Sequence, residues 1–166
     1  MLIAFSGLPG AGKTTLARAL ADRLGAVYLR IDTIEHALLS LDGVSLVDRG
    51  AGYGVAYAIA EDNLGLGRVV VADSVNPIGI TREAWRKVAR QAGVRIVDVV
   101  VTCSDSRAHQ DRIAARALGT RGSSWSDVRD RPFEAAPEGA IMVDTAARSV
   151  EQCLTELERA LAISSQ

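Results

Sequence analysis

Residues 7–14 read Gly-Leu-Pro-Gly-Ala-Gly-Lys-Thr, which matches the pattern G-x-x-x-x-G-K-[ST] at every fixed position. An apolar run at residues 2–5 precedes the motif, and residues 13–24 follow it with leucines at helical spacing. This order of strand, loop and helix is the context in which such a motif binds phosphate. We therefore expect residues 7–15 to form a phosphate-binding loop between a buried strand and an amphipathic helix.

The residue types in this loop suit a polyphosphate. Glycines allow backbone N–H groups to turn toward phosphate oxygens without a clash from a Cβ atom. The helix that begins near Lys13 adds the positive end of its dipole. We expect the Lys13 ammonium on the β- and γ-phosphates, as a catalytic group, and the Thr14 hydroxyl on Mg²⁺. The expected nucleotide-binding residues are Gly7, Leu8, Pro9, Gly10, Ala11, Gly12, Lys13, Thr14 and Thr15.

Apolar strands alternate with helices along the whole chain. The expected strands lie at residues 2–5, 27–31, 68–72, 94–103 and 141–143. Helices are expected at residues 13–24, 32–41, 53–64, 81–92, from 104 or 105 to about 118, and after a capping box formed by Ser149 and Gln152. Most strands are continuous apolar runs, which is typical of parallel strands covered on both faces. The sequence therefore predicts an α/β fold with three layers, helix–sheet–helix, that binds ligands at the carboxyl ends of its strands.

Aspartates follow several of these strands, at the edge where a ligand would bind. Asp73 comes after the third strand and is expected to hold Mg²⁺, usually through water; Asp144, after the last strand, is a weaker candidate. Asp32 follows the second strand and could accept the proton of a hydroxyl group during phosphoryl transfer. The same residue could instead form a capping box with Glu35. We expect the catalytic role for Asp32.

Arginines gather between residues 107 and 131. Arg112 and Arg116 are four residues apart, so they share one helix face. An arginine placed on the transferred phosphate can speed its transfer by about 10³–10⁵-fold. We expect at least one of Arg112, Arg116 and Arg121 to touch phosphate, with Arg116 and Arg112 as the catalytic candidates, although a solvated, salt-bridged face stays open. Residues 119–139 are poor in apolar side chains and are expected to form a short, mobile lid.

Composition limits the classes of protein to consider. The 166 residues suit a single domain, 1–166, and the formal net charge of −1 disfavours a general attraction to nucleic acid or to an acidic membrane. The N-terminus lacks a signal-peptide pattern, and no run reaches the ~18 apolar residues of a membrane span. Cys103 and Cys153 do not make a disulfide framework. We expect a cytoplasmic protein, as a monomer or a homodimer.

The chain resembles the small adenylate-kinase-like P-loop kinases, an AAA-type ATP-binding family, over nearly its whole length. The resemblance rests on residues 7–15, on Asp32, on the run Asp73-Ser74-Val75-Asn76 and on the helix with Arg112 and Arg116. It is greatest to the branch with chloramphenicol phosphotransferase, gluconate kinase, adenylylsulfate kinase, zeta-toxin kinases and the kinase domain of polynucleotide kinase. It implies a five-stranded parallel sheet in the order 2-3-1-4-5. It also implies ATP–Mg²⁺-dependent phosphorylation of a hydroxyl group, with Asp32 as base, Asp73 near the metal and Arg116 or a neighbour as lid arginine.

No motif names the acceptor of the phosphate. Glu35 stands where polynucleotide kinases carry an arginine, so a nucleic-acid acceptor is disfavoured, and we expect a small molecule, either a metabolite or an antibiotic. The residues expected around it are His36, Arg49, Tyr53, Tyr57, Asn76 and Arg82, although ordinary helix packing would also explain the tyrosines. Two other functions stay open. One is an ATP-binding switch with slow ATPase activity, and the other is a kinase for 5′-hydroxyl groups of nucleotides or polynucleotides.

Overall fold

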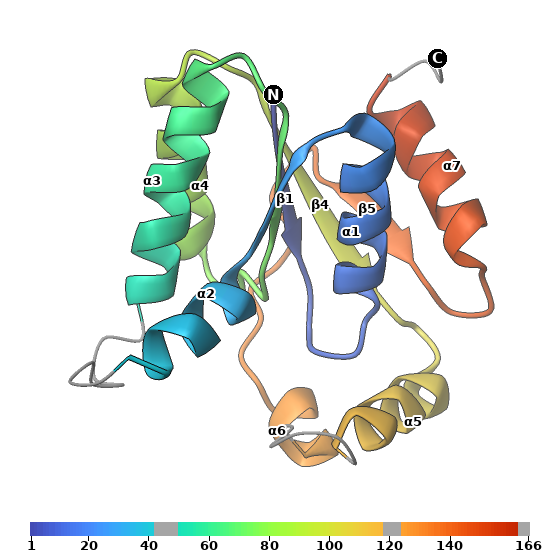
Figure 1. Ribbon diagram of the computed structural model, residues 1–166. Coiled ribbons are helices and arrows are strands. Elements are labelled where there is room, and N and C mark those ends of the chain that lie inside the picture. Colours follow the sequence, from blue (N-terminus) through green and yellow to red (C-terminus); the bar gives the residue numbers. More distant parts are fainter. Residues whose placement is uncertain (42–49, 118–123, 163–166) are drawn as a thin grey trace.

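Strands and helices alternate along the chain (Figure 1). The computed structural model describes residues 1–41, 50–117 and 124–162, and of residues 116 and 117 it describes the backbone only. The strands are β1 (Leu2–Ser6), β2 (Val27–Arg30), β3 (Val70–Asp73), β4 (Ile96–Thr102) and β5 (Ile141–Asp144). The helices are α1 (Lys13–Leu24), α2 (Ile31–Leu39), α3 (Ala51–Gly65), α4 (Gly79–Gln91), α5 (Ser106–Ala117), α6 (Trp125–Arg129) and α7 (Val150–Ala160).

The strands form a parallel sheet in the order β2-β3-β1-β4-β5, which confirms the expected fold class and strand order. Asp73 of β3 is in register with Phe5 of β1 on one side and with Arg30 of β2 on the other. These strands therefore end level with one another. Because the phosphate-binding loop follows β1, the loop leaves the sheet beside the ends of β3 and β2.

Helices cover both faces of the sheet, with α1 and α7 on one face and α3 and α4 on the other (Figure 1). The first layer packs through a cluster that includes Ile3, Phe5, Leu16, Leu20, Val99 and Leu157. The second packs through Leu2, Ala4, Ala56, Ala60, Val70 and Trp85. Successive residues of β1 thus contribute to opposite layers, as expected when side chains alternate along a strand buried on both faces. The remaining helices, α2, α5 and α6, lie at the end of the sheet where the strands finish (Figure 1).

The start of α2 differs from the sequence prediction. The helix begins at Ile31, directly after β2, and its N-cap is Arg30, which forms no side-chain cap hydrogen bond. The alternative considered for Asp32, a capping box with Glu35, is therefore wrong. The predicted start of this helix, at residue 32, is one residue too late. Arg30 has an extended backbone and is itself the N-cap, so β2 and α2 meet with no loop between them. Asp32 lies inside the first turn, and its side chain is not used as a cap.

Other helix ends follow the sequence more closely. The capping box of Ser149 and Gln152 at the start of α7 is confirmed. Asp105 accepts hydrogen bonds from the N–H groups of Arg107 and Ala108, so it caps the start of α5 as expected. In the segment 119–139, residues 119–123 lie outside the described residues, and the part that is described contains the short helix α6, which was not anticipated.

Candidate active site

The phosphate-binding loop has glycines at positions where other residues would not fit. The φ angles of Gly7, Gly10 and Gly12 are 144°, 82° and 100°, in the region that L side chains rarely adopt. A Cβ atom on Gly7 would lie 2.2 Å from the carbonyl oxygen of Val101, and one on Gly10 would lie 2.6 Å from Cδ1 of Ile113. The loop therefore passes close to β4 and to α5, and its shape depends on these glycines.

Lys13 is the first residue of α1 and is 7% exposed. Its Nζ donates a hydrogen bond of 3.0 Å to the carbonyl oxygen of Leu8, so the side chain folds back over the loop. The N-cap of α1 is Gly12, which provides no side-chain cap hydrogen bond. The free N–H groups at a helix start and the positive end of the dipole together favour an anion. Next along the helix, Thr14 is half-buried and Thr15 is exposed.

Helix α5 contacts the loop from outside the sheet, and α6 packs against α5. The Nε2 atom of His109 lies 2.7 Å from the carbonyl oxygen of Pro9, and because a carbonyl can only accept, this ring nitrogen is the donor. The His109 ring packs edge-on against Trp125 of α6, with ring centroids 5.2 Å apart. Ile113, one turn after His109, reaches the space above Gly10. The turn at Pro9 and Gly10 is thus held by side chains from a distant part of the chain.

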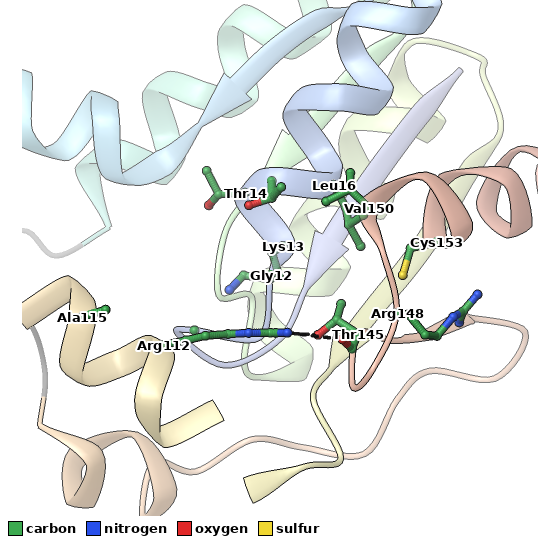
Figure 2. A pocket seen from close by; sticks show the side chains of 12 residues that line it. Gly12, Lys13, Thr14, Leu16, Arg112, Ala115, Thr145, Arg148, Val150 and Cys153 are labelled. Carbon is green, nitrogen blue, oxygen red and sulfur yellow. Dashed lines mark hydrogen bonds between the residues drawn. The ribbon is translucent and has the colours of Figure 1, made fainter. Parts of the chain in front are cut away.

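Arg112 and Thr145 join the loop to the end of β5. Arg112 Nη1 donates to Thr145 Oγ1 across 2.8 Å, and Nη2 donates to the Thr145 carbonyl oxygen across 3.2 Å (Figure 2). The Thr145 hydroxyl also lies 2.9 Å from the carbonyl oxygen of Ala11, to which it can donate. Thr145 is buried and therefore acts as a common partner for the loop and for α5.

A pocket of about 470 Å³ opens beside this junction. Figure 2 shows Arg112 reaching across from α5 to Thr145, with Gly12 and Lys13 next to them and with Arg148, Val150 and Cys153 toward α7. The pocket extends from the phosphate-binding loop to an apolar wall near α7. Its volume is typical of sites for small organic ligands. A ligand with phosphates at one end and a flat ring at the other fits this distribution of groups.

The ends of β2 and β3 bring carboxylates next to the loop. Asp73 is 2% exposed, accepts a 2.8 Å hydrogen bond from the Tyr28 hydroxyl, and lies 3.8 Å from Arg30 Nε. Arg30 Nη2 also pairs with Asp32 across 2.9 Å, and the Asp32 side chain is 46% exposed. Burial, followed by the charge of Asp73, raises the pKa of Tyr28, so this hydroxyl stays a donor. The buried carboxylate is therefore fixed, and the exposed one is open to a substrate.

A buried run of polar contacts connects the loop with α3. Asn76 is fully buried, and its backbone has a φ of 46°. Its Nδ2 donates to Ser6 Oγ across 2.9 Å, and its backbone N–H donates to the Tyr53 hydroxyl across 3.3 Å. Burial raises the pKa of Tyr53, so its hydroxyl keeps its proton. Of the residues expected around the acceptor, Tyr53 and Asn76 are brought together.

Arg82 is 3% exposed and binds backbone carbonyl groups. Its Nε donates to Asn76 across 3.1 Å, Nη2 donates to Glu134 across 3.0 Å, and Nη1 donates to Ala135. The guanidinium also lies over the ring of Phe133, 5.1 Å from its centroid. Arg82 therefore ties the segment after α6 to the turn between β3 and α4, and it has no charge exposed toward a ligand.

The remaining candidates are spread apart. Tyr57 packs edge-on against the buried ring of Trp85, with centroids 4.6 Å apart, so it belongs to the core between α3 and α4. His36 is exposed on α2. Arg49 and Arg121 lie outside the described residues, and so does the side chain of Arg116.

The sequence analysis missed several residues of the site. Tyr28 and Arg30 lie within a strand, and they act by contacting carboxylates that come later in the chain. His109 and Thr145 act by contacting the loop. For Thr145, position alone was a usable signal, since it follows a strand whose carboxyl end faces the site. For His109, nothing local distinguishes it from a surface residue of an amphipathic helix.

This loop, at the first strand of a sheet ordered 2-3-1-4-5, defines a P-loop kinase. The chain belongs to a family described as "AAA domain", whose model matches residues 2–137. It is similar to an adenylyl-sulfate kinase of Prochlorococcus marinus, with 25% identity over 163 residues that cover 95% of this chain and 81% of that protein. These findings confirm the resemblance seen in the sequence, and the chain is an ATP-dependent kinase.

Solved structures show the same fold. An APS kinase of Mycobacterium tuberculosis in complex with AMPPNP and APS has a TM-score of 0.74 at 21% identity, covering 97% of this chain and 96% of that one. A gluconokinase of Sinorhizobium meliloti has a TM-score of 0.67 at 19% identity, covering 96% and 90%. Within the ranges that the structure describes, no helix is long and apolar enough to span a membrane.

Proposed function

We propose that this kinase transfers the γ-phosphate of ATP to a hydroxyl group of a small molecule, with Mg²⁺ bound alongside the nucleotide. The proposal rests on the observation that β1, β3 and β2 end side by side. Asp73 lies opposite Phe5 on one neighbouring strand and opposite Arg30 on the other. The phosphate-binding loop follows β1, and Asp32 follows β2 by two residues. Phosphoryl transfer needs this proximity between a phosphate site and a proton acceptor.

The loop and the adjoining pocket fit ATP. The positive φ angles of Gly7, Gly10 and Gly12 suit a loop whose N–H groups converge on an anion. Lys13 Nζ, now on a loop carbonyl, is near enough to exchange that acceptor for a phosphate oxygen. Arg112 has its planar guanidinium fixed by Thr145 at the edge of the pocket, which suits stacking on a nucleobase. The pocket wall near α7 would then surround the nucleoside.

The described residues also fit a magnesium ion carried by the nucleotide. Thr14 and Asp73 would hold Mg²⁺, with Asp73 acting through water because it is almost fully buried. When bound, Mg²⁺ neutralises charge on the phosphate oxygens. Tyr28 and Arg30 support this role of Asp73, because they keep its carboxylate in one orientation.

Asp32, Lys13 and Arg116 would each take part in the transfer step. Asp32 would accept the proton of the acceptor hydroxyl while that oxygen forms a bond to the γ-phosphorus. The bond between the γ-phosphorus and its bridging oxygen breaks, and ADP leaves with that oxygen. Arg30 supports the role of Asp32, since it holds a side chain that is otherwise exposed. Lys13 and Arg116 would balance charge on the transferred group.

The test is Mg²⁺-dependent ADP release from ATP across a panel of hydroxyl acceptors. The panel contains aminoglycosides, chloramphenicol-like and nucleoside antibiotics, gluconate, adenylylsulfate, nucleosides and 5′-hydroxyl oligonucleotides. We expect one acceptor to raise ADP release well above the background with water. Replacing Asp32 by Asn should lower that rate at least ~10²-fold and leave the affinity for ATP unchanged, because only the proton acceptor is lost. Asp62→Asn, at an exposed position of α3, is the matched control.

Each result has a distinct meaning. Near-normal turnover of the Asp32→Asn variant would contradict the role of Asp32 as base. Bound ATP with only slow background hydrolysis for every acceptor would favour an ATP-dependent switch. Turnover of oligonucleotides that falls steeply with salt concentration would favour a 5′-hydroxyl kinase.

A further inference from the structure

The Glu35 carboxylate lies between α2 and α3 without a hydrogen-bond or ion-pair partner among the described residues. Its side chain passes over the buried Gly52 of α3, where a Cβ atom would come within 2.4 Å of Glu35 Cγ and 3.3 Å of its Oε1. Glycine at that position therefore lets Glu35 lie against α3. Among residues 1–41, 50–117 and 124–162, no hydrogen bond or ion pair reaches this carboxylate. A half-buried carboxylate without a partner is unusual, because such groups are normally compensated.

Asp32 and His36, two side chains of opposite charge on the same helix, are the charged groups that act on the pKa of Glu35. Burial, and then the charge of Asp32 one turn earlier on α2, raises the pKa of Glu35, while His36 acts in the opposite direction. Asp73, at the end of β3, lies 3.8 Å from Arg30 Nε. The guanidinium of Arg30 lies beside both aspartates and is already paired with Asp32. Of Asp32, Glu35 and Asp73, Glu35 is therefore the carboxylate without an ion pair among the described residues.

Glu35 is connected to the phosphate-binding loop through a short series of contacts. Its charge, like that of Asp32, acts on Tyr53, the residue after Gly52. The Tyr53 hydroxyl accepts the N–H of Asn76, whose side chain reaches Ser6, the residue before the loop. The Oδ1 atom of Asn76 is buried and has no hydrogen-bond partner in the described chain. This series of contacts thus links Glu35 with the residue that precedes the phosphate-binding loop.

We propose that Glu35 selects the acceptor, and that the acceptor is a small hydroxyl compound that carries an ammonium group. The inference rests on the proposed phosphotransfer to a hydroxyl. An ammonium group would pair with Glu35 as Arg30 pairs with Asp32, and this pair would compensate the half-buried carboxylate. A carboxylate, sulfate or phosphate at the same place would face like charges. Adenylylsulfate and gluconate, to which the names of relatives point, are therefore expected to be poor acceptors.

The test begins with pools of compounds because the acceptor is unidentified. A deproteinised cell extract is separated at neutral pH on ion exchangers into cationic, neutral and anionic small-molecule pools. Each pool is incubated with the full chain, Mg²⁺ and ATP labelled at the γ-phosphate, and Lys13→Ala serves as the blank. We expect labelled product from the cationic pool.

The second stage isolates the contribution of charge. The compound labelled in the cationic pool is compared with its N-acetyl derivative, which keeps the hydroxyl groups and loses the positive charge. We expect the wild-type chain to prefer the amine at least tenfold in kcat/KM, and Glu35→Gln to reduce this preference to about twofold or less. Glu61→Gln, at an exposed position of α3, should keep the wild-type preference. The isosteric Gln leaves the packing over Gly52 intact, so a loss confined to the amine reports charge.

The outcomes separate this inference from the proposed function. Product only from the neutral or anionic pool would overturn the inference and leave phosphotransfer in place. An equal loss of activity on the amine and on its N-acetyl derivative in Glu35→Gln would also overturn it, since a purely structural role gives that result. No Lys13-dependent product from any pool would overturn the proposed function, and this inference with it.

Discussion

The phosphate half of the site is built from backbone, whereas the acceptor half is built from side chains. In the loop, Gly7, Gly10 and Gly12 set the path of one short segment. In the acceptor half, Tyr28 reaches Asp73 across 45 residues of sequence, and Asn76 reaches Ser6 across 70. A backbone site allows few substitutions. A side-chain site changes its ligand when one residue changes, so the nucleotide is expected to be common to relatives and the acceptor particular to each.

The largest effect that would test this comparison is expected in the phosphate half. Replacing Lys13 by Ala removes the ammonium at the helix start and should lower kcat/KM for ATP by about 10²–10³-fold. Calorimetric titration with ATP–Mg²⁺ and assays of ADP release measure the loss. Lys87→Ala is the matched control, because Lys87 is exposed on α4. Wild-type affinity for ATP in Lys13→Ala would contradict the assignment of the loop.

In the acceptor half, a large effect is expected on stability. Arg82→Met keeps much of the side-chain volume but leaves the carbonyl groups of Asn76, Glu134 and Ala135 without their donor. The free energy of unfolding should fall by about 2 kcal/mol, since the carbonyl groups lose a charged donor. Urea unfolding measures the change, with Arg90→Met, on the exposed face of the same helix, as control. Equal midpoints for both variants would show that Arg82 does not hold this half together.

A smaller effect should appear where α5 contacts the loop. His109→Ala removes one hydrogen bond to Pro9, and at about 1 kcal/mol the KM for ATP should rise about fivefold with little change in kcat. His109→Gln, which offers a donor of similar reach, should recover part of the loss. His36→Ala is the control, because His36 is the other histidine and is exposed. A fall in kcat at constant KM would place His109 in the transfer step instead.

The smallest expected effect concerns pH. The pKa of Glu35 lies above its ordinary value of 4.5, so the folded chain holds this proton more tightly than the unfolded chain. The charged carboxylate therefore costs stability, and the cost develops as pH rises through that ordinary value and is complete above the folded pKa. Glu35→Gln should be more stable than wild type at pH 7, by less than about 1 kcal/mol, and equal to it near pH 3. Thermal unfolding across this range measures the difference; a constant gap at every pH would exclude titration as its cause.

The phosphate half could be predicted from the sequence because its information is local. The motif is contiguous, it follows an apolar strand, and it begins a helix with leucines at helical spacing. The order of the sheet followed from the family that the motif indicates. The roles of these residues stay predictions, since the fold shows where they lie and leaves their chemistry to experiment.

The acceptor half could be predicted only in outline. Asp32 and Asp73 were located because each follows a predicted strand, but their partners Tyr28 and Arg30 were not, since neither lies near Asp73 in sequence. Asp32 was also given a capping alternative that is wrong, because β2 enters α2 without a loop. Arg82 looked like a ligand-binding arginine from its position, and only the fold shows that it binds backbone carbonyl groups. Side-chain partnerships of this kind depend on tertiary structure.

The packing of His109 against Trp125 also has an optical consequence. The chain has two tryptophans, and the other, Trp85, is fully buried between α3 and α4 with no hydrogen-bond partner for its Nε1 in the described residues. A Trp85→Phe chain would leave no orphaned indole N–H in the core, and its remaining indole emission would come from Trp125 alone. Trp125 packs against the His109 ring, whose Nε2 donates a hydrogen bond to the Pro9 carbonyl oxygen. The protein thus carries an intrinsic fluorophore beside the histidine that contacts its phosphate-binding loop, and no attached dye is needed to follow the packing of α6 on α5 in solution.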